Sequence, residues 1–168
     1  MEKEFILLVK EQLDSGHEIE KILYAPNVMA QLIHLRQICL VPAIVGGSSD
    51  SAKLDALDDL FVDFKHSGEP FVVYSCFRRF LPFVQILLDK HEIPFGRIVG
   101  GQKSAERRQV EENLNSGEIQ AIVGTISAMG EGLNLQKATT AIFTDIDWTP
   151  AANVQAEDRI HRMLIQQS

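Results

Sequence analysis

The sequence contains little cysteine, no long apolar run and no surplus of positive charge. Its two cysteines, Cys39 and Cys76, are too far apart for a metal-binding spacing or a disulfide framework, so we expect a reducing, cytoplasmic setting. No apolar stretch approaches the ~18 residues that span a bilayer. Residues 1–12 have a short apolar patch but acidic flanks and no cleavage pattern of a secretory signal. These absences exclude a membrane protein and predict no membrane partner.

The charge is negative and unevenly distributed. The net charge is −7, and residues 1–66 hold five more acidic than basic residues, whereas residues 67–118 are balanced. A free-standing nucleic-acid-binding protein usually has a basic surplus. Any contact with a polyanion is therefore expected to be local, or shared with another domain.

What is present is typical of a soluble globular protein, with 45% hydrophobic and 23% charged residues in 168. Apolar residues at helical spacing predict that residues 2–41 are helical, with a break at Pro26-Asn27. Gly46 to Ser49 has the composition of a flexible link. We therefore predict a helical arm over residues 1–48 and a separate domain over residues 49–168.

The second segment alternates between helical and strand patterns. Short continuous apolar runs indicate buried strands, and the runs between them are amphipathic or polar at helical spacing. The alternation predicts βαβ units, and hence an α/β fold with a parallel sheet and helices on both faces. Ligands bind such sheets at the carboxyl ends of the strands. Those ends are the loops after Tyr74, Val99, Val123 and Phe143.

Two of these loops combine small residues with positive charge. Residues 75–79, Ser-Cys-Phe-Arg-Arg, can hold a phosphate at a helix start, or can be a plain helix start with solvated arginines. Residues 100–104, Gly-Gly-Gln-Lys-Ser, allow close approach of a ligand, or form an ordinary turn. The longer loop at residues 124–135 is rich in Gly, Ser and Thr, which favours a functional role, but it has neither a Walker A nor a Rossmann spacing.

The last strand is followed by a D-x-D pair, Asp145 and Asp147. Such a pair can hold a divalent metal with a nucleotide sugar. We favour the alternative in which Asp145 orders the loop and Asp147 is solvated, and we predict no metal site. On the final helix Gln155, Arg159 and Arg162 share one face. Asp158 can pair with Arg162, whereas Arg159 has no well-placed carboxylate and suits an external phosphate.

These residues together resemble a known family. Residues 124–135, the segment Asp145 to Pro150 and the run from Gln155 to Arg162 resemble helicase motifs V and VI of the Swi/Snf-like branch of superfamily 2, in order and in interval. Val72 to Ser75 is similar to motif IV, and the resemblance extends over roughly residues 30–166. It implies the second, RecA-like domain of an ATP-dependent motor that moves along double-stranded DNA without separating the strands.

The resemblance also implies roles for individual residues. Arg159 and Arg162 would be the arginine fingers that face the γ-phosphate. The nucleotide side would be completed by Gly130, Glu131, Gly132 and Gln155. The DNA backbone would be contacted, mostly through neutral donors, by Ser75, Arg78, Gly101, Gln102, Thr125, Ser127 and Asn134.

Two departures from the family pattern shape the expected activity. The chain has no G-x-x-x-x-G-K-[ST] loop and no Asp-Glu box for magnesium. ATP with Mg²⁺ would therefore bind in a complete two-domain motor, with none held tightly by this chain, which would be inactive alone. Its expected partners are double-stranded DNA and an N-terminal RecA-like ATPase domain, with a nucleoid location in a prokaryote. The second departure is that the family's Arg-x-Gly-Gln ending is replaced by Arg162-Met163-Leu164-Ile165-Gln166, which is one residue longer and lacks the glycine.

Two other functions remain open from the residues alone. One is a nucleotide-sugar transferase-like domain that uses Asp145 and Asp147. The other is a non-catalytic interaction module in which residues 1–50 dock a protein.

Overall fold

The computed structural model describes residues 5–12, 18–25, 27–130 and 132–161. Contacts within the chain divide it into two compact units, residues 1–56 and residues 57–168. We describe each unit by itself. The division falls inside a helix, so the boundary expected between residues 48 and 49 stays a prediction.

The first unit begins with a β-hairpin, not with a helix. Strand β1 (Phe5–Gln12) pairs antiparallel with β2 (Glu18–Ala25), in a register that runs from Phe5 opposite Ala25 to Gln12 opposite Glu18. The prediction of helix over this part of residues 2–41 is therefore wrong. Five consecutive apolar residues at 5–9 satisfy a strand as well as a helix, because a continuous run has no period that distinguishes the two.

The remainder of the first unit is helical, as predicted. Helix α1 (Val28–Leu40) is capped by Asn27, whose Oδ1 accepts a hydrogen bond from the Ala30 N–H at 2.9 Å. Pro42 then starts the short 3₁₀ helix η1 (Pro42–Val45). The Ser51 hydroxyl donates to the Leu40 carbonyl and accepts from the Leu54 N–H at the start of α2 (Ala52–Ser67). Ser51 thus caps the start of α2.

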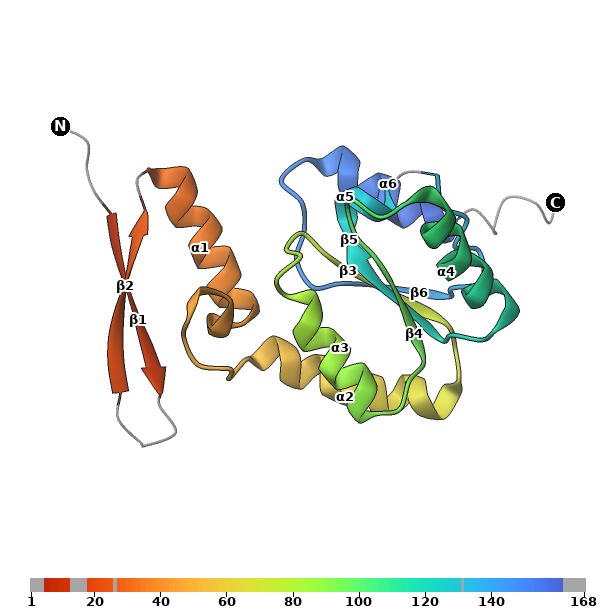
Figure 1. The fold of residues 1–168 in the computed structure, drawn as a ribbon, viewed down its shortest axis with the longest axis horizontal. Helices are drawn as coiled ribbons and strands as arrows, with labels where there is room; N and C mark the ends of the chain where they lie inside the picture. The colour runs from red at the N-terminus through yellow and green to blue at the C-terminus, as the bar shows by residue number, and fades with distance from the viewer. Residues whose placement is uncertain (1–4, 13–17, 26, 131, 162–168) are drawn as a thin grey trace. The chain divides into compact units, whose positions relative to one another are not determined.

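The second unit contains a four-stranded parallel sheet. The strand order is β4-β5-β3-β6, and each neighbouring pair is parallel. This architecture confirms the predicted α/β fold (Figure 1). The strands are β3 (Phe71–Ser75), β4 (Phe95–Ile98), β5 (Ala121–Thr125) and β6 (Thr140–Phe143), and the helices after them are α3 (Leu81–Lys90), α4 (Ser104–Ser116), α5 (Ile126–Met129) and α6 (Pro150–His161).

Both faces of this sheet are covered because alternate residues of the central strand point to opposite sides. Phe71 of β3 stacks on Phe64 of α2, with ring centroids 4.2 Å apart. Tyr74 stacks on Phe143 of β6 at 4.8 Å and belongs to the buried cluster that includes Ala156 of α6. Figure 1 shows α2 and α3 on one side of the sheet and α4, α5 and α6 on the other.

Two glycines permit close packing beside the central strands. A Cβ at Gly124 of β5 would lie 2.2 Å from the Ile98 carbonyl oxygen and 2.8 Å from Met129 Sδ. A Cβ at Gly96 of β4 would lie 2.4 Å from Val110 Cγ1 of α4. The two positions therefore need glycine for lack of space, not for backbone conformation. None of the helices in the described ranges is long and apolar enough to span a membrane.

Candidate functional site at the carboxyl edge of the sheet

Asp145 ties the ends of two neighbouring strands together. Its Oδ1 accepts hydrogen bonds from Ser75 Oγ at 2.8 Å, from the Cys76 N–H at 3.0 Å and from Thr144 Oγ1 at 3.1 Å. The loop after β6 is thereby fixed to the loop after β3. Asp145 orders the loop, as the favoured interpretation of the D-x-D pair predicted. Ser75 is fully buried and its hydroxyl is engaged in this contact, and its predicted role in DNA binding stays a prediction.

Asp147 closes the same loop onto the start of α6. Its Oδ1 accepts from the Thr149 N–H at 2.8 Å, and its main-chain N–H and carbonyl bond to the side-chain amide of Asn153 at 2.8 and 2.9 Å. Both carboxylates therefore accept hydrogen bonds from protein donors. Within the described residues, His, Cys, Asp and Glu form no group of three or more that could hold a metal ion.

Arg159 is directed at the loop after β5. Its Nη2 donates a 2.9 Å hydrogen bond to the Gly130 carbonyl, and its side chain is half-buried. Gly130 itself ends α5, because its N–H donates to the Ile126 carbonyl at 2.9 Å. Arg159 Nε is buried and has no acceptor within the described part of the chain. The structure thus brings together two residues that the resemblance placed on the nucleotide side.

Tyr74 supports the helix that carries this arginine. Its hydroxyl donates to the Ala156 carbonyl of α6 at 3.3 Å. Burial raises the pKa of Tyr74 to about 12, and the positive charge of Arg159 acts in the opposite direction. A phenol that stays neutral can remain buried beside the guanidinium without forming an ion pair.

Other residues predicted for the nucleotide side are placed only in part. Gln155 is exposed on α6, one turn before Arg159, and Gly132 is exposed with a φ of +70°. Arg162 and Glu131 lie outside the described residues. Of the predicted face of three polar residues on the final helix, the structure therefore describes Gln155 and Arg159.

The residues predicted to contact DNA fall into two groups. Gln102 closes the turn between β4 and α4, since its Oε1 accepts from the Val99 N–H at 2.8 Å and its Nε2 donates to the Arg97 carbonyl at 3.0 Å. Thr125 is 7% exposed. Gln102, Thr125 and Ser75 thus make contacts within the fold or are buried, and their contact with DNA stays a prediction. The exposed residues, which remain free to face a ligand, are Arg78, Gly101, Ser127 and Asn134.

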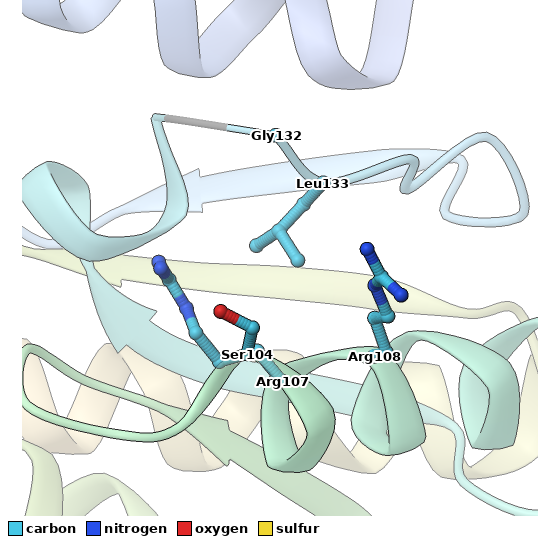
Figure 2. Close-up of a pocket in the computed structure, with 5 residues that line it drawn as sticks. All are labelled: Ser104, Arg107, Arg108, Gly132 and Leu133. Atoms are coloured by element: carbon cyan, nitrogen blue, oxygen red, sulfur yellow. The ribbon is translucent and has the colours of Figure 1, made fainter.

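Sequence reasoning missed three side chains that shape this edge. Asn153 holds the loop after β6, as described above. Glu111 of α4 accepts the Asn134 N–H at 3.1 Å and so holds the far end of the loop that begins at Gly130. Arg108 lines a hollow over α4 (Figure 2). Only Arg108 left a signal in the sequence, as one of two adjacent arginines after a Gly-Gly turn.

Comparison with known proteins identifies the second unit. The sequence matches the family described as helicase conserved C-terminal domain over residues 52–164. The chain belongs to this family. As a helicase C-terminal domain it is similar to the human chromatin-remodeling ATPase INO80, with 35% identity over 116 residues. It is also 36% identical over 115 residues to the SWI/SNF-related matrix-associated actin-dependent regulator of chromatin subfamily A containing DEAD/H box 1A from Danio rerio.

The helicase C-terminal domain is a small part of these relatives. Each alignment covers 68% of this chain, but 8% of the human protein and 12% of the Danio rerio protein. The resemblance to the Swi/Snf-like branch is thereby confirmed. The names of both relatives refer to chromatin, so they give no support to the expected cytoplasmic location.

A solved structure confirms the fold. The crystal structure of the C-terminal part of the Fun30 ATPase domain aligns with a TM-score of 0.64 and 23% identity. The alignment covers 81% of this chain and 47% of that chain. The prediction of a RecA-like α/β fold is therefore confirmed.

Proposed function

We propose that this helicase C-terminal domain is the second RecA-like half of an ATP-dependent motor that moves along double-stranded DNA. The observation that carries the proposal is the place of Arg159, at the carboxyl edge of the sheet and bonded to the Gly130 carbonyl. Chromatin-remodeling ATPases among the relatives support the same assignment. ATP with Mg²⁺ would bind chiefly to a first RecA-like domain, and this chain would not hydrolyse ATP alone.

Arg159 has the donors that an arginine finger needs. A guanidinium carries five N–H donors, and the bond to Gly130 uses one of its Nη groups. The buried Nε has no acceptor in the described structure, so the residue fits a site that an incoming phosphate completes. Arg162 follows three residues later and would share its face of the helix. Arginines aimed at a γ-phosphate stabilise the charge of the transition state.

The DNA track would use the exposed residues of the same edge. Gly101 and Ser127 offer main-chain and hydroxyl donors, and Arg78 adds one cation. Contacts of neutral donors to phosphates position a protein on a duplex without a large basic surface. This arrangement reconciles a net charge of −7 with a DNA partner. Since these contacts address the backbone of a duplex, we expect translocation without strand separation.

The test is DNA-stimulated ATP hydrolysis by the chain joined to a first RecA-like domain that carries a Walker A loop. We expect Arg159→Ala and Arg162→Ala each to lower kcat by on the order of 10³-fold. Arg159→Lys retains the positive charge but lacks the guanidinium, so it separates loss of the arginine finger from loss of the fold. Lys137→Ala, which removes an exposed cation before β6, is the matched control.

Wild-type turnover in both alanine variants would show that these arginines do not act on the phosphate. Hydrolysis by the isolated chain would show that it contains a complete ATPase. Neither result would depend on which DNA sequence stimulates the motor.

A further inference from the structure

The side-chain amide of Asn153 makes two hydrogen bonds to a single residue. Its Oδ1 accepts from the Asp147 N–H at 2.8 Å, and its Nδ2 donates to the Asp147 carbonyl at 2.9 Å. An amide that uses its acceptor and a donor against the same residue has one allowed orientation. Because Asn153 lies in the first turn of α6, this pair of bonds fixes the direction in which the helix leaves the loop after β6.

The loop that Asn153 grips is itself fixed to the central strand β3. The Thr144 N–H and hydroxyl both donate to the Tyr74 carbonyl at 3.0 Å, and Asp145 is bonded to the residues that end β3, as described above. Asp147 also accepts the Thr149 N–H, so the loop is held up to the residue before α6. The contact of Asn153 therefore sets the start of α6 relative to β3.

The same side of α6 carries Arg159. Asn153, Ala156 and Arg159 are spaced by three residues each, so they follow one another along one side of the helix. Ala156 is fully buried, and its carbonyl accepts from the Tyr74 hydroxyl at 3.3 Å. Arg159 then reaches the Gly130 carbonyl at 2.9 Å. A rotation or shift of the first turn of α6 would thus be transmitted along this side to the guanidinium.

We propose that Asn153 is a positioning residue for Arg159. It would touch no phosphate, and it would act through the direction and rotation of α6. The role in catalysis rests on the proposed function, since Arg159 would face a γ-phosphate only in the complete motor. The control of the guanidinium by Asn153, in contrast, is a property of this chain by itself. An error of about 1 Å in the placement of a reacting group can cost on the order of 10²-fold in rate.

The first test uses the chain alone and follows the side-chain N–H signals of Arg159 by NMR, assigned with Arg159→Lys. We expect a resolved, slowly exchanging signal from the bond to the Gly130 carbonyl. Asn153→Ala should move this signal toward that of a solvent-exposed arginine. Val154→Ala, at the next position of α6 and 53% exposed, is the matched control and should leave it unchanged.

Asn153→Asp keeps the acceptor for the Asp147 N–H and loses the donor, so it serves if the alanine variant does not fold. It should move the Arg159 signal in the same direction by a smaller amount. A signal that stays at its wild-type position in every folded Asn153 variant would overturn the positioning role.

The second test measures DNA-stimulated ATP hydrolysis by the chain joined to a first RecA-like domain. We expect Asn153→Ala to lower kcat about tenfold or more and to change KM for ATP by less than about twofold, because ATP would bind chiefly to the other domain. In an Arg159→Ala background the same substitution should have no further effect, since the group that it positions is absent. An equal loss in both backgrounds would contradict the proposal.

The two tests separate the positioning role from the proposed function. A displaced Arg159 signal in a joined protein that shows no DNA-stimulated hydrolysis would contradict the motor and leave the control of the guanidinium by Asn153 intact. Loss of hydrolysis in Arg159→Ala together with wild-type kcat in Asn153→Ala would contradict the positioning role alone.

Discussion

At the scale of single residues, the candidate site depends on a few polar side chains whose partners are main-chain groups. Tyr74 illustrates this arrangement, because its hydroxyl donates to the Ala156 carbonyl while its ring stacks on Phe143. The phenol is buried, and ionisation would place a negative charge in the core. The pH at which the Tyr74 hydroxyl ionises is therefore a measure of how closely α6 packs against the sheet.

We expect Tyr74 to ionise near pH 12 and the ionisation to destabilise the fold. Its pKa is raised from the ordinary value of 10.0 to about 12, so the folded state keeps a proton that the unfolded state loses. The stabilising contribution is complete below pH 10 and is lost as the pH rises through 12. Absorbance at 295 nm follows the ionisation, and Tyr74→Phe assigns it. A midpoint near 10 for the signal that Tyr74→Phe removes would contradict the burial.

The sequence indicated some of these residues and not others, for physical reasons. The role of Asp145 in ordering its loop could be predicted, because a carboxylate directly after a buried strand needs hydrogen-bond donors from a neighbouring loop. The bond between Glu111 and Asn134 was not, because it joins a helix surface to a main-chain N–H 23 residues away. The role of Gln102 was also missed, since an amide in a turn can satisfy its own backbone or face a ligand with no difference in sequence.

At the scale of elements, the strands of the sheet were easier to predict than the first hairpin. Continuous apolar runs flanked by turns identified β3 and β5 because both faces of these central strands are buried. The edge strand β6 has a similar run but is only partly buried. In the hairpin, β1 has an equally continuous apolar run at residues 5–9. However, β1 pairs with β2, the next strand in the chain, and no alternation of strands with amphipathic helices marks residues 5–9 as a strand. Among the packing contacts between elements, the close packing at Gly124 of β5 gives the clearest prediction for stability.

We expect Gly124→Ala to destabilise the domain by several kcal/mol, since overpacking a core costs about 1–3 kcal/mol and here the clash is partly with main chain. The new Cβ would lie 2.2 Å from the Ile98 carbonyl, which cannot rotate away as a side chain would. Urea unfolding monitored by circular dichroism measures the change. Gly100→Ala, where a Cβ meets nothing within 4 Å, is the control. Equal midpoints for the two variants would show that β4 and β5 are not packed this closely.

At the scale of the whole second unit, an ion cluster links α2 to the end of α3. Asp58 accepts from Lys90 Nζ at 2.6 Å, and its Oδ1 lies 2.6 Å from His91 Nε2. Hydrogen bonds from Lys90, then from His91, hold the pKa of Asp58 below its ordinary value. This cluster uses no residue of the candidate site.

We expect Asp58→Asn to lower the thermal midpoint at neutral pH and to have a smaller effect in acid. A carboxyl whose folded pKa is depressed contributes stability above its unfolded pKa of 3.8, and that contribution is lost as the pH falls through the folded value. Melting curves between pH 2 and pH 7 check the prediction. Asp59→Asn, at the neighbouring exposed position, is the control. A deficit independent of pH would show that Asp58 acts through packing alone.

The bond between Arg159 and Gly130 has a consequence for how the complete protein would work. The guanidinium is attached to the first carbonyl of a loop whose other end is fastened to Glu111. A shift of the Gly130 carbonyl would therefore either move the Arg159 guanidinium or break this hydrogen bond. An error of about 1 Å in the placement of a reacting group can cost on the order of 10²-fold in rate. In the proposed motor, this one hydrogen bond of 2.9 Å would then couple DNA binding to the rate of ATP hydrolysis.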